Sequence, residues 1–562
     1  MLTSKTQTRR LAVALLALAL AACGGERAAP GAGGESVADG PGSGHATFTG
    51  AAPGGTVIVL ADREPDDLNP LTYSSDPGYQ AVHLIFRALA KRDSTLSGFQ
   101  PDLARSWELS PDSGSLLVHL RNDVRWQDGV PVTAEDVVFT LARQKDPAVA
   151  SPRKPDVAAA GEAVAVDSFT VRIPLRIRGP YAVNSLLELV PVPKHLLEAE
   201  EPGQIRFSGF SRRPVGNGFF RFGEWAAGQH LTLVASEEVP EGRAPLDRVI
   251  MRFVPDVNAA MTELLSGQGD MMKVPTDQSQ RVLASANVAL YHAPRVRPAW
   301  IAWNVRRPPL DDVRVRRAIA MGLDRPALVA GLLGEQGEAA LSPIPSTLRE
   351  HSASSRPIPY DPEGAKRLLA EAGWIDTNGD GIADKGGRPL RIEVDYNNTD
   401  PTRQDMLVAM QSMLRGIGVD LVPRPFESTA WVTRRRGGDF QGSFWGWGWG
   451  PGVMGMNAEA IFHSRSIPPS GPNFAGYRSA RVDALIDSTL VTYDPTRLRH
   501  LWAELEQQLI DDAVYLPIYL DPELFGVNKR VHNVRFRGIE WWEDVAYWNI
   551  PPERRLPRDR VR

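Results

Sequence analysis

The hydrophobic positions of this chain recur with two different periods, which predicts a mixture of strands and helices. Short, apolar runs rich in β-branched residues have the composition of buried strands. Longer segments place apolar side chains three and four positions apart, which is the spacing of one helix face. Strands are predicted at 55–60, 116–120 and 390–394, and helices are predicted after Thr133, over 361–373 and from Asp494 to Leu509.

The starts of these helices carry residues that cap N-termini. Asp361 and Asp494 are each followed by proline, whose fixed φ suits the first helical position. Thr133 and Asp136 have the spacing of a capping box, with Asp in place of the usual Glu or Gln. The sequence therefore predicts an α/β fold, and 562 residues are too many for one hydrophobic core, so we expect at least two lobes.

The first 22 residues have the three parts of a secretory signal. Lys5, Arg9 and Arg10 precede an apolar run at 11–20, which is too short to span a bilayer, and two alanines follow it. Cys23, the only cysteine of the chain, comes next. The letters LAAC resemble the bacterial lipobox, in which the cysteine becomes the lipid-modified first residue. An ordinary signal peptide followed by a chance cysteine is the alternative.

Residues 23–55 are dominated by Gly, Ala, Pro and Ser, so they bury too little apolar surface to offset the entropy of ordering. We expect a flexible tether with an end-to-end distance on the order of 30 Å. Loss of residues 1–22 removes three basic and no acidic residues, which changes the net charge from -4 to about -7. This charge gives no indication of nucleic acid as a partner.

The sequence contains no recognisable catalytic motif. It has no G-x-S-x-G, H-E-x-x-H, Walker or dinucleotide-binding pattern, and its ten His residues are scattered singly. We therefore expect no enzyme, no metal site and no cofactor. Residues 376–381 (DTNGDG) match the start of a calcium loop, but position 12 would be Gly387, which has no carboxylate. A tight turn is the favoured interpretation, and calcium binding stays open.

A segment rich in tryptophan and glycine is the best candidate for a binding surface. Trp445, Trp447 and Trp449 alternate with glycines, so in an extended chain the three indoles point to one side. Glycine on the other side lets another part of the chain approach closely. A Pro/Gly-rich stretch follows at 450–455, which favours a strand end that opens onto a ligand cleft. An interior stack of rings under a helix is the alternative.

Short motifs occur in a characteristic order along the chain. They are PDDLNPL at 65–71, PDLA at 101–104, VRWQDG at 124–129, PVGNG at 214–218, DVRVR at 312–316 and NFAGY at 473–477. In this order they resemble the family 5 extracellular solute-binding proteins, the dipeptide-, oligopeptide- and nickel-binding components of ABC importers. The resemblance covers nearly all of residues 56–540.

The resemblance implies a two-lobed, periplasmic-binding-protein-like (type II) fold with an inserted subdomain in lobe one, which closes on its ligand about a hinge. By analogy, lobe one comprises 56–295, with the subdomain at roughly 97–210, and lobe two comprises 296–515. Residues 516–562 return to lobe one and end in an Arg-rich tail, 554–562, which we expect to be exposed to solvent.

The ligand chemistry departs from that of the peptide-binding members. In those proteins an aspartate shortly after the strand with the G-W motif pairs with the peptide's amino group, whereas residues 448–456 here contain no acidic residue and the first is Glu459. Another acid supplies that charge, or the ligand has no free amine there, because a buried ammonium needs a partner. The candidate cleft residues are Trp445, Trp447 and Trp449 as stacking walls, Asn304 as a hydrogen-bonding group, and Tyr73, with a structural role as the alternative for Asn304 and Tyr73.

Two classes of function are compatible with these observations. The first, implied by the resemblance, is a monomeric receptor outside the cytoplasm, in the periplasm or on the cell surface, anchored to the membrane by lipid on Cys23. It captures short peptides, or alternatively oligosaccharides, nickel complexes or other small solutes, and delivers them to an ABC permease in the inner membrane without covalent chemistry. The second is a sensor or assembly lipoprotein with the same fold.

Overall fold

The computed structural model of the chain describes residues 52–93, 96, 98–450, 454–536 and 541–560. The predicted signal peptide (1–22), the lipidation site Cys23 and the tether up to residue 51 lie outside the described residues, so these expectations stay predictions. Within the described ranges, no helix combines the length and the apolar character that crossing a bilayer requires.

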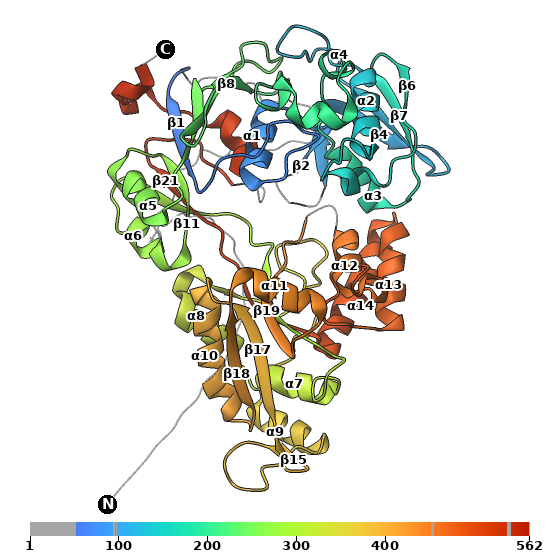
Figure 1. Cartoon of the computed structure of the whole chain (residues 1–562), viewed down its shortest axis with the longest axis vertical. Coiled ribbons are helices and arrows are strands. Elements are labelled where there is room, and N and C mark those ends of the chain that lie inside the picture. The colour runs from blue at the N-terminus through green and yellow to red at the C-terminus, as the bar shows by residue number, and fades with distance from the viewer. Residues whose placement is uncertain (1–51, 94–95, 97, 451–453, 537–540, 561–562) are drawn as a thin grey trace, which may run out of the picture. The chain divides into compact units, whose positions relative to one another are not determined.

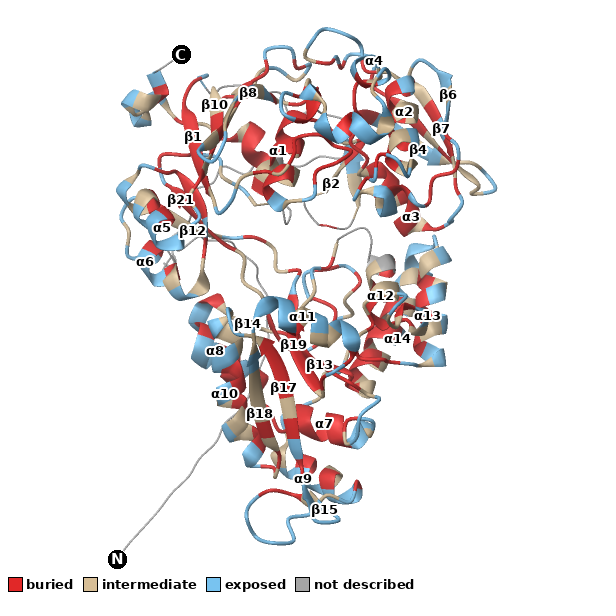
Figure 2. Cartoon of the chain, in the orientation of Figure 1, coloured by how far each residue is buried: buried red, intermediate tan, exposed pale blue. Residues whose placement is uncertain are grey.

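Lobe one is organised by a seven-stranded sheet with the strand order β12-β21-β11-β1-β10-β9-β8 (Figure 1). The predicted first strand, β1, lies at its centre, parallel to β10 and β11, and is buried from Thr56 to Leu60 (Figure 2). The strands are β1 (Thr56–Ala61), β8 (Phe220–Ala226), β9 (His230–Ala235), β10 (Arg248–Phe253), β11 (Met271–Val274), β12 (Val288–His292) and β21 (Leu524–Asn528). The helices of this part are α1 (Asp76–Ile85), α5 (Val257–Ser266) and α6 (Ser279–Leu283).

A further subdomain is inserted between α1 and β8. Its four-stranded antiparallel sheet has the order β4-β5-β7-β6, and α2 starts with the expected capping box, in which the Thr133 N–H donates to Asp136 Oδ2 at 2.8 Å. The strands are β2 (Ala90–Arg92), β3 (Phe99–Pro101), β4 (Ala104–Leu109), β5 (Ser115–Leu120), β6 (Val164–Asp167) and β7 (Thr170–Pro174). The helices are α2 (Ala134–Lys145), α3 (Pro180–Leu187) and α4 (Lys194–Leu197).

Lobe two contains a six-stranded sheet with the order β14-β20-β13-β19-β17-β18, and α10 packs on β17 and β18. The strands are β13 (Pro298–Trp303), β14 (Glu338–Ala339), β17 (Arg391–Asn397), β18 (Asp420–Phe426), β19 (Gly442–Gly446) and β20 (Tyr515–Leu520). Short strands β15 (Asp384–Lys385) and β16 (Arg388–Pro389) form a hairpin. The helices around this sheet are α7 (Val313–Met321), α8 (Arg325–Leu333), α9 (Pro362–Glu371), α10 (Pro401–Arg415) and α11 (Ser428–Gly437).

Three further helices of lobe two, α12 (Met454–Phe462), α13 (Ala480–Val491) and α14 (Pro495–Asp512), pack on one another. The predicted N-caps are confirmed, because Asp494 accepts a hydrogen bond from the Arg497 N–H at 2.7 Å and Asp361 accepts one from the Gly364 N–H at 2.8 Å. On α14, the side chains at helical spacing that include Trp502, Leu505 and Leu509 form the buried face. Local capping and periodicity therefore determine where these helices begin and which side they bury.

The chain passes between the two sheets twice, at 293–297 and at 521–523, and the two crossings lie side by side. The Ala293 N–H donates to the Glu523 carbonyl at 3.0 Å, and the Asp521 N–H donates to the Arg297 carbonyl at 2.8 Å. The expected boundary between 515 and 516 falls inside β20, which still belongs to the sheet of lobe two. Paired crossings of this kind are the covalent basis of a hinge.

The C-terminal segment is not a solvated tail, so that expectation was wrong. Asp559 is buried and accepts hydrogen bonds from the Thr56 N–H at 2.8 Å and from Arg530 Nη1 at 2.6 Å. Arg558 pairs with the buried Asp270 at 2.9 Å, and Asp270 also binds Arg530. A buried acid in the tail therefore holds the segment against the first strand of lobe one.

Candidate ligand-binding site

The Trp-Gly segment, residues 445–450, begins at the end of β19 and stays extended beyond it. Trp445 is opposite Trp300 of β13, and the same pairing continues as the Trp447 N–H donates to Pro298 O at 3.3 Å and the Trp449 N–H to Val296 O at 3.0 Å. Bonding at every second residue is the pattern of an extended strand. The three indoles accordingly contribute to one hydrophobic cluster together with the rings of the α12–α14 helices.

The three indoles differ in how much of their surface is accessible. Trp445 and Trp449 are 2% and 1% exposed, and the Trp449 indole N–H donates to the Pro343 carbonyl at 3.0 Å. Trp445 meets Trp300 edge-on, with ring centroids 5.6 Å apart. Trp447 is only half-buried and packs its ring against Trp445 at 6.1 Å. Of the three candidates, Trp447 thus offers ring surface to a ligand, whereas Trp445 and Trp449 support it from behind.

The glycine side of this segment approaches charged side chains near the hinge. A Cβ at Gly446 would lie 3.4 Å from Asp521 Oδ2 and 3.7 Å from Arg403 Nη2, and one at Gly448 would lie 3.2 Å from Arg297 Nε. A Cβ at Gly448 would have to displace Arg297 by a few tenths of an ångström, whereas a Cβ at Gly446 would be in ordinary contact with Asp521 and Arg403. The close approach expected from the alternating glycines is therefore present, and its partners are charged side chains.

Asp521 is the acid that the structure brings to this glycine side. Burial raises the pKa of its carboxyl group, and the nearby Arg403 and Arg297 oppose that rise. Asp521 lies in the second crossing between the lobes. The peptide-binding relatives instead have their aspartate in the stretch that corresponds to residues 448–456, so the acid here comes from a different part of the chain.

The other two candidates lie in different surroundings. Asn304 is 1% exposed; its Nδ2 donates to the carbonyls of Gly438 and Phe440 at 3.0 and 3.1 Å, and its Oδ1 accepts from Arg306 Nε at 3.1 Å. Its amide is therefore directed at the protein itself. Tyr73 is buried in the core of lobe one, with its ring 5.8 Å from that of Tyr79. The structure does not bring Tyr73 to the Trp-Gly segment in any contact between described residues.

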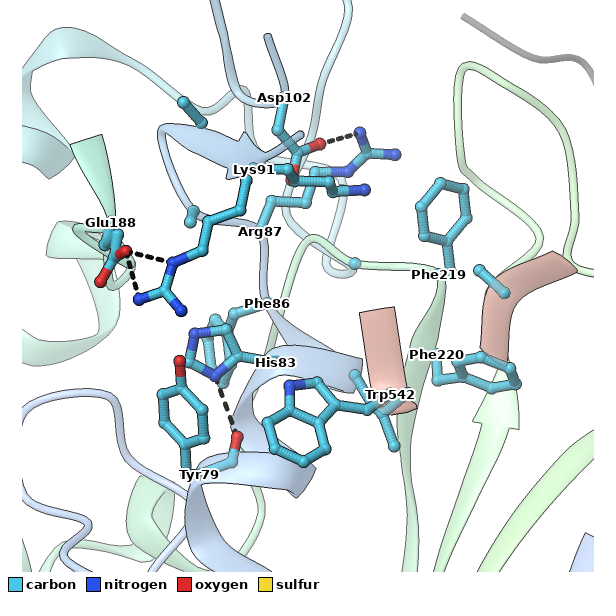
Figure 3. Close-up of a pocket in the computed structure, with 16 residues that line it drawn as sticks. Tyr79, His83, Phe86, Arg87, Lys91, Asp102, Glu188, Phe219, Phe220 and Trp542 are labelled. Carbon is cyan, nitrogen blue, oxygen red and sulfur yellow. Dashed lines mark hydrogen bonds and ion pairs between the residues drawn. The ribbon is translucent and has the colours of Figure 1, made fainter. Parts of the chain in front are cut away.

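Lobe one contains a small cavity of about 70 Å³ between α1, β2 and the 3₁₀ segment Trp541–Tyr547 (Figure 3). Tyr79 and Trp542 form an aromatic wall with centroids 5.4 Å apart, and the His83 ring lies tilted against Tyr79 with centroids 4.1 Å apart. Burial lowers the pKa of His83 to about 4, so the ring is neutral. On the far side Asp102 pairs with Arg87 at 2.9 Å. The cavity lining therefore combines aromatic rings with three basic side chains, Arg87, Lys91 and Arg92, and two acidic ones, Asp102 and Glu188.

A wider hollow of 850 Å³ lies after the end of β1, beside the edge strand β8. Glu64 accepts a hydrogen bond there from the Trp225 indole at 2.6 Å, and the Arg212 guanidinium covers the same ring at 4.0 Å. The carboxyl end of a central parallel strand is a common place for ligands in α/β folds. Both hollows are lined by lobe-one residues.

The loop that resembles a calcium site is a closed turn in this structure. Asp376 accepts hydrogen bonds from the Gly379 and Gly381 N–H groups at 2.8 and 3.0 Å, and Asp380 accepts one from the Ile382 N–H at 2.8 Å. Within the described part of the chain, no three His, Cys, Asp or Glu side chains are grouped so as to hold a metal ion. The turn interpretation explains these carboxylates without a cation.

Two residues beside the Trp-Gly segment were not predicted from the sequence. Trp300 on β13 and Arg435 on α11 both contact the Trp445 ring. Trp300 belongs to the apolar run PAWIAW, which indicates only a buried strand, and Arg435 is the middle residue of Arg-Arg-Arg, which indicates only a charged helix face. The sequence held no signal for their proximity to Trp445.

Comparison with known proteins supports the fold. The profile described as bacterial extracellular solute-binding proteins, family 5 Middle, matches residues 98–468, more than half of the chain. The oligopeptide-binding protein AppA of Bacillus subtilis (strain 168) is 27% identical over 509 residues, which are 87% of this chain and 92% of that protein. AppA in complex with a nonapeptide has a TM-score of 0.71 at 25% identity, covering 89% of this chain and 100% of that chain. NikZ of Campylobacter jejuni in complex with Ni(L-His) has a TM-score of 0.73 at 24% identity, covering 88% and 99%.

The paired crossings and the structural matches define a two-lobed solute-binding protein. The chain belongs to the family 5 bacterial extracellular solute-binding proteins, as the order of its motifs implied. This is a family of substrate-binding proteins rather than enzymes, and its members among the relatives include an oligopeptide binder and a protein solved with a nickel complex.

Proposed function

We propose that this protein is the lipid-anchored receptor of an ABC importer, which captures short peptides between its two lobes and delivers them to a membrane permease. The observation that carries the proposal is the position of the Trp-Gly segment, whose backbone pairs with Val296 and Pro298, at the end of the first crossing of the hinge. A ligand that contacts Trp447 there would touch lobe two beside the hinge, so closure of lobe one would enclose it.

The anchor is supported by the sequence before the folded body. The basic, apolar and small-residue parts of 1–22 lead directly to Cys23, and the stretch that follows is rich in Gly and Ala. A phase partition in Triton X-114 tests this, since a lipid-modified chain enters the detergent phase. The Cys23→Ser variant should stay in the aqueous phase, and a wild-type chain that also stays there would contradict the anchor.

The proposal that the ligand is a short peptide is tested by identifying the molecules that the purified protein has bound. The full chain is purified under native conditions, its ligand is released with denaturant, and the released molecules are identified by mass spectrometry. Recovery of peptides of two to ten residues would support peptide capture. Trp447→Ala should release much less ligand, because the accessible ring is removed, whereas Trp374→Ala, which changes a half-buried indole elsewhere in lobe two, should release as much as the wild type.

A non-peptide solute is the second candidate, and one observation favours it. Residues 448–456 lack the acid that pairs with a peptide amine in relatives, and the glycine side of the segment approaches two arginines, Arg297 and Arg403, against one acid, Asp521. An organic acid, a sugar or a metal complex in the released fraction, without peptides, would decide for this candidate. A sensor or assembly role, in which binding occurs without a transport partner, is distinguished by the neighbouring genes: permease and ATPase genes favour transport, and a sensor-kinase gene favours signalling.

A further inference from the structure

Buried nitrogen donors without an acceptor gather around the Trp-Gly segment. Buried polar atoms normally have a hydrogen-bond partner, so a group of exceptions in one place needs an explanation. In the described part of the chain, the unpaired donors near this segment are Nε of Arg435 and the indole Nε1 of Trp300, Trp431, Trp445 and Trp447. Arg403 Nε, in contrast, lies 3.2 Å from Asp400 Oδ2. An environment with this many unpaired N–H donors favours a ligand that carries hydrogen-bond acceptors.

Arg435 is the charged member of this group that is free of ion pairs. Its guanidinium carbon lies 4.4 Å from the ring centroid of Trp431, 4.6 Å from that of Trp445 and 5.3 Å from that of Phe474. No described acidic side chain lies within ion-pair distance of it. Burial, together with the charges of Arg403 and Arg436, lowers its pKa to about 10, so it is still cationic at neutral pH.

The acids of the neighbouring elements are already paired with other arginines. Asp395 binds Arg434 Nε at 2.9 Å and lies 3.8 Å from Arg424, and Asp439 binds Arg434 Nη1 at 2.6 Å. Glu427 caps the start of α11. The aromatic contacts hold the Arg435 side chain in place without neutralising it, and only its Nε is closed off from solvent, so its Nη groups keep their donors for a partner from outside.

We propose that Arg435 is an anion-binding residue of the ligand site, which receives a carboxylate of the bound solute beside the rings of Trp431 and Trp445. The proposal rests on the proposed function, because it assumes that the ligand enters along the Trp-Gly segment. A planar guanidinium held on aromatic faces matches a carboxylate with two parallel hydrogen bonds. The carboxylate belongs to the C-terminus of a peptide or to an organic acid, and these two sources share the same chemistry.

The test is titration calorimetry on the full chain with four probes: tri-alanine, tri-alanine amide, succinate and succinamide. In the wild type each acid should bind about tenfold more tightly than its amide, the effect of one charge-assisted pair. Arg435→Gln should bind acid and amide equally. Arg436→Gln, which removes the exposed neighbouring charge on the same helix, should keep the wild-type preference. Arg435→Lys keeps the charge without the planar group and should retain part of the preference.

The outcomes separate this proposal from the peptide assignment. A preference for succinate over succinamide that depends on Arg435, with no binding of either tri-alanine form, would support the anion-binding role of Arg435 and contradict the assignment of peptides as the ligand. Equal binding of acids and amides by the wild type, or an unchanged preference in a folded Arg435→Gln variant, would overturn the anion site even if peptides bind. The fold of each variant is checked by its thermal unfolding midpoint.

Discussion

Asn304 shows how a residue that suggests ligand binding can be fully engaged by its own chain. Its side chain bridges the carbonyls of Gly438 and Phe440, in the turn that leads from α11 to β19, and it receives Arg306. The amide therefore fixes the start of the strand that carries the Trp-Gly segment. Its contribution to a ligand would be indirect, through the position of that strand.

Asn304→Ala is expected to lower the free energy of unfolding by about 2–3 kcal/mol, because it leaves two buried carbonyl groups unpaired. Denaturant unfolding followed by tryptophan fluorescence measures this loss. Asn398→Ala changes an exposed asparagine of the same lobe and should leave the midpoint unchanged. Equal midpoints for both variants would contradict the bridging role of Asn304.

His351 is a second residue with a measurable role, because it binds the fully buried Glu506 through Nδ1 at 2.7 Å. This hydrogen bond raises the pKa of His351 above its ordinary value of 6.5, and partial burial opposes the rise. A raised pKa in the folded state means that protonation stabilises the fold. The contribution is complete below about pH 6.5 and is lost as the pH rises through the folded-state value.

His351→Gln should therefore cost up to about 1 kcal/mol at pH 5.5 and less at pH 8.5, the size being limited by the partial exposure of the ring. Guanidinium unfolding at the two pH values measures the difference. The exposed His500 on α14 provides the control, since His500→Gln should leave the free energy of unfolding unchanged. A cost that is the same at both pH values would count against the charged pair.

At the level of elements, the C-terminal 3₁₀ turn Pro557–Arg560 acts as a clamp on lobe one. Asp559 has a fully buried carboxylate that joins the N-terminal end of β1 to Arg530, after β21. Asp559→Asn should lower the free energy of unfolding by about 3 kcal/mol, because Arg530 and the Thr56 N–H lose a charged partner in a buried setting. Chemical denaturation gives the value, and Glu553→Gln, at an exposed position nearby, should behave as the wild type.

The elements that the sequence predicted well are those determined by neighbours in the chain. The caps at Asp361 and Asp494 and the extended backbone of the Trp-Gly segment depend on residues a few positions apart, and each was found where expected. The clamp was missed because Asp559 and Thr56 are 503 positions apart. The arginine-rich composition of residues 554–562 alone predicted a tail exposed to solvent.

Of the candidate site, the sequence indicated only the residues that a local pattern marks. The tryptophans were identified from their spacing, but Arg435 reaches Trp445 and Phe474 only through tertiary packing of α11 on the strand. Sequence patterns also could not tell which indole is accessible, because the cover over Trp445 and Trp449 comes from β13 and from the distant helices α12–α14. Asp521 was missed because it approaches Gly446 only once the second crossing is folded.

At the level of the whole molecule, the two lobes touch at a place other than the hinge. Tyr181 of α3 is fully buried in the cluster of α12–α14, and its hydroxyl accepts a hydrogen bond from the Trp502 indole at 2.7 Å. Nearby, the Gly179 N–H donates to the Tyr493 hydroxyl at 2.8 Å. These contacts hold the inserted subdomain on the helices of lobe two and stabilise the arrangement seen here.

Tyr181→Phe removes the hydroxyl and leaves the Trp502 N–H without a partner, so the population of open molecules should rise by about tenfold in the absence of ligand. Small-angle X-ray scattering should then give a larger radius of gyration for the unliganded variant than for the wild type. Tyr360→Phe, at a half-exposed tyrosine, serves as the control. Identical scattering curves for the two variants would exclude a latch at Tyr181.

Because the two crossings are adjacent, one continuous stretch of coding sequence specifies lobe two and could be exchanged as a unit. Residues 298–520 form one continuous segment, and the residues that flank it are joined by the hydrogen bonds from Ala293 to Glu523 and from Asp521 to Arg297. All seven strands of the lobe-one sheet are encoded outside this segment. A recombination that replaces it with the matching segment of a relative exchanges the Trp-Gly segment and the arginines of α11 together, and it leaves every strand of the lobe-one sheet unaltered.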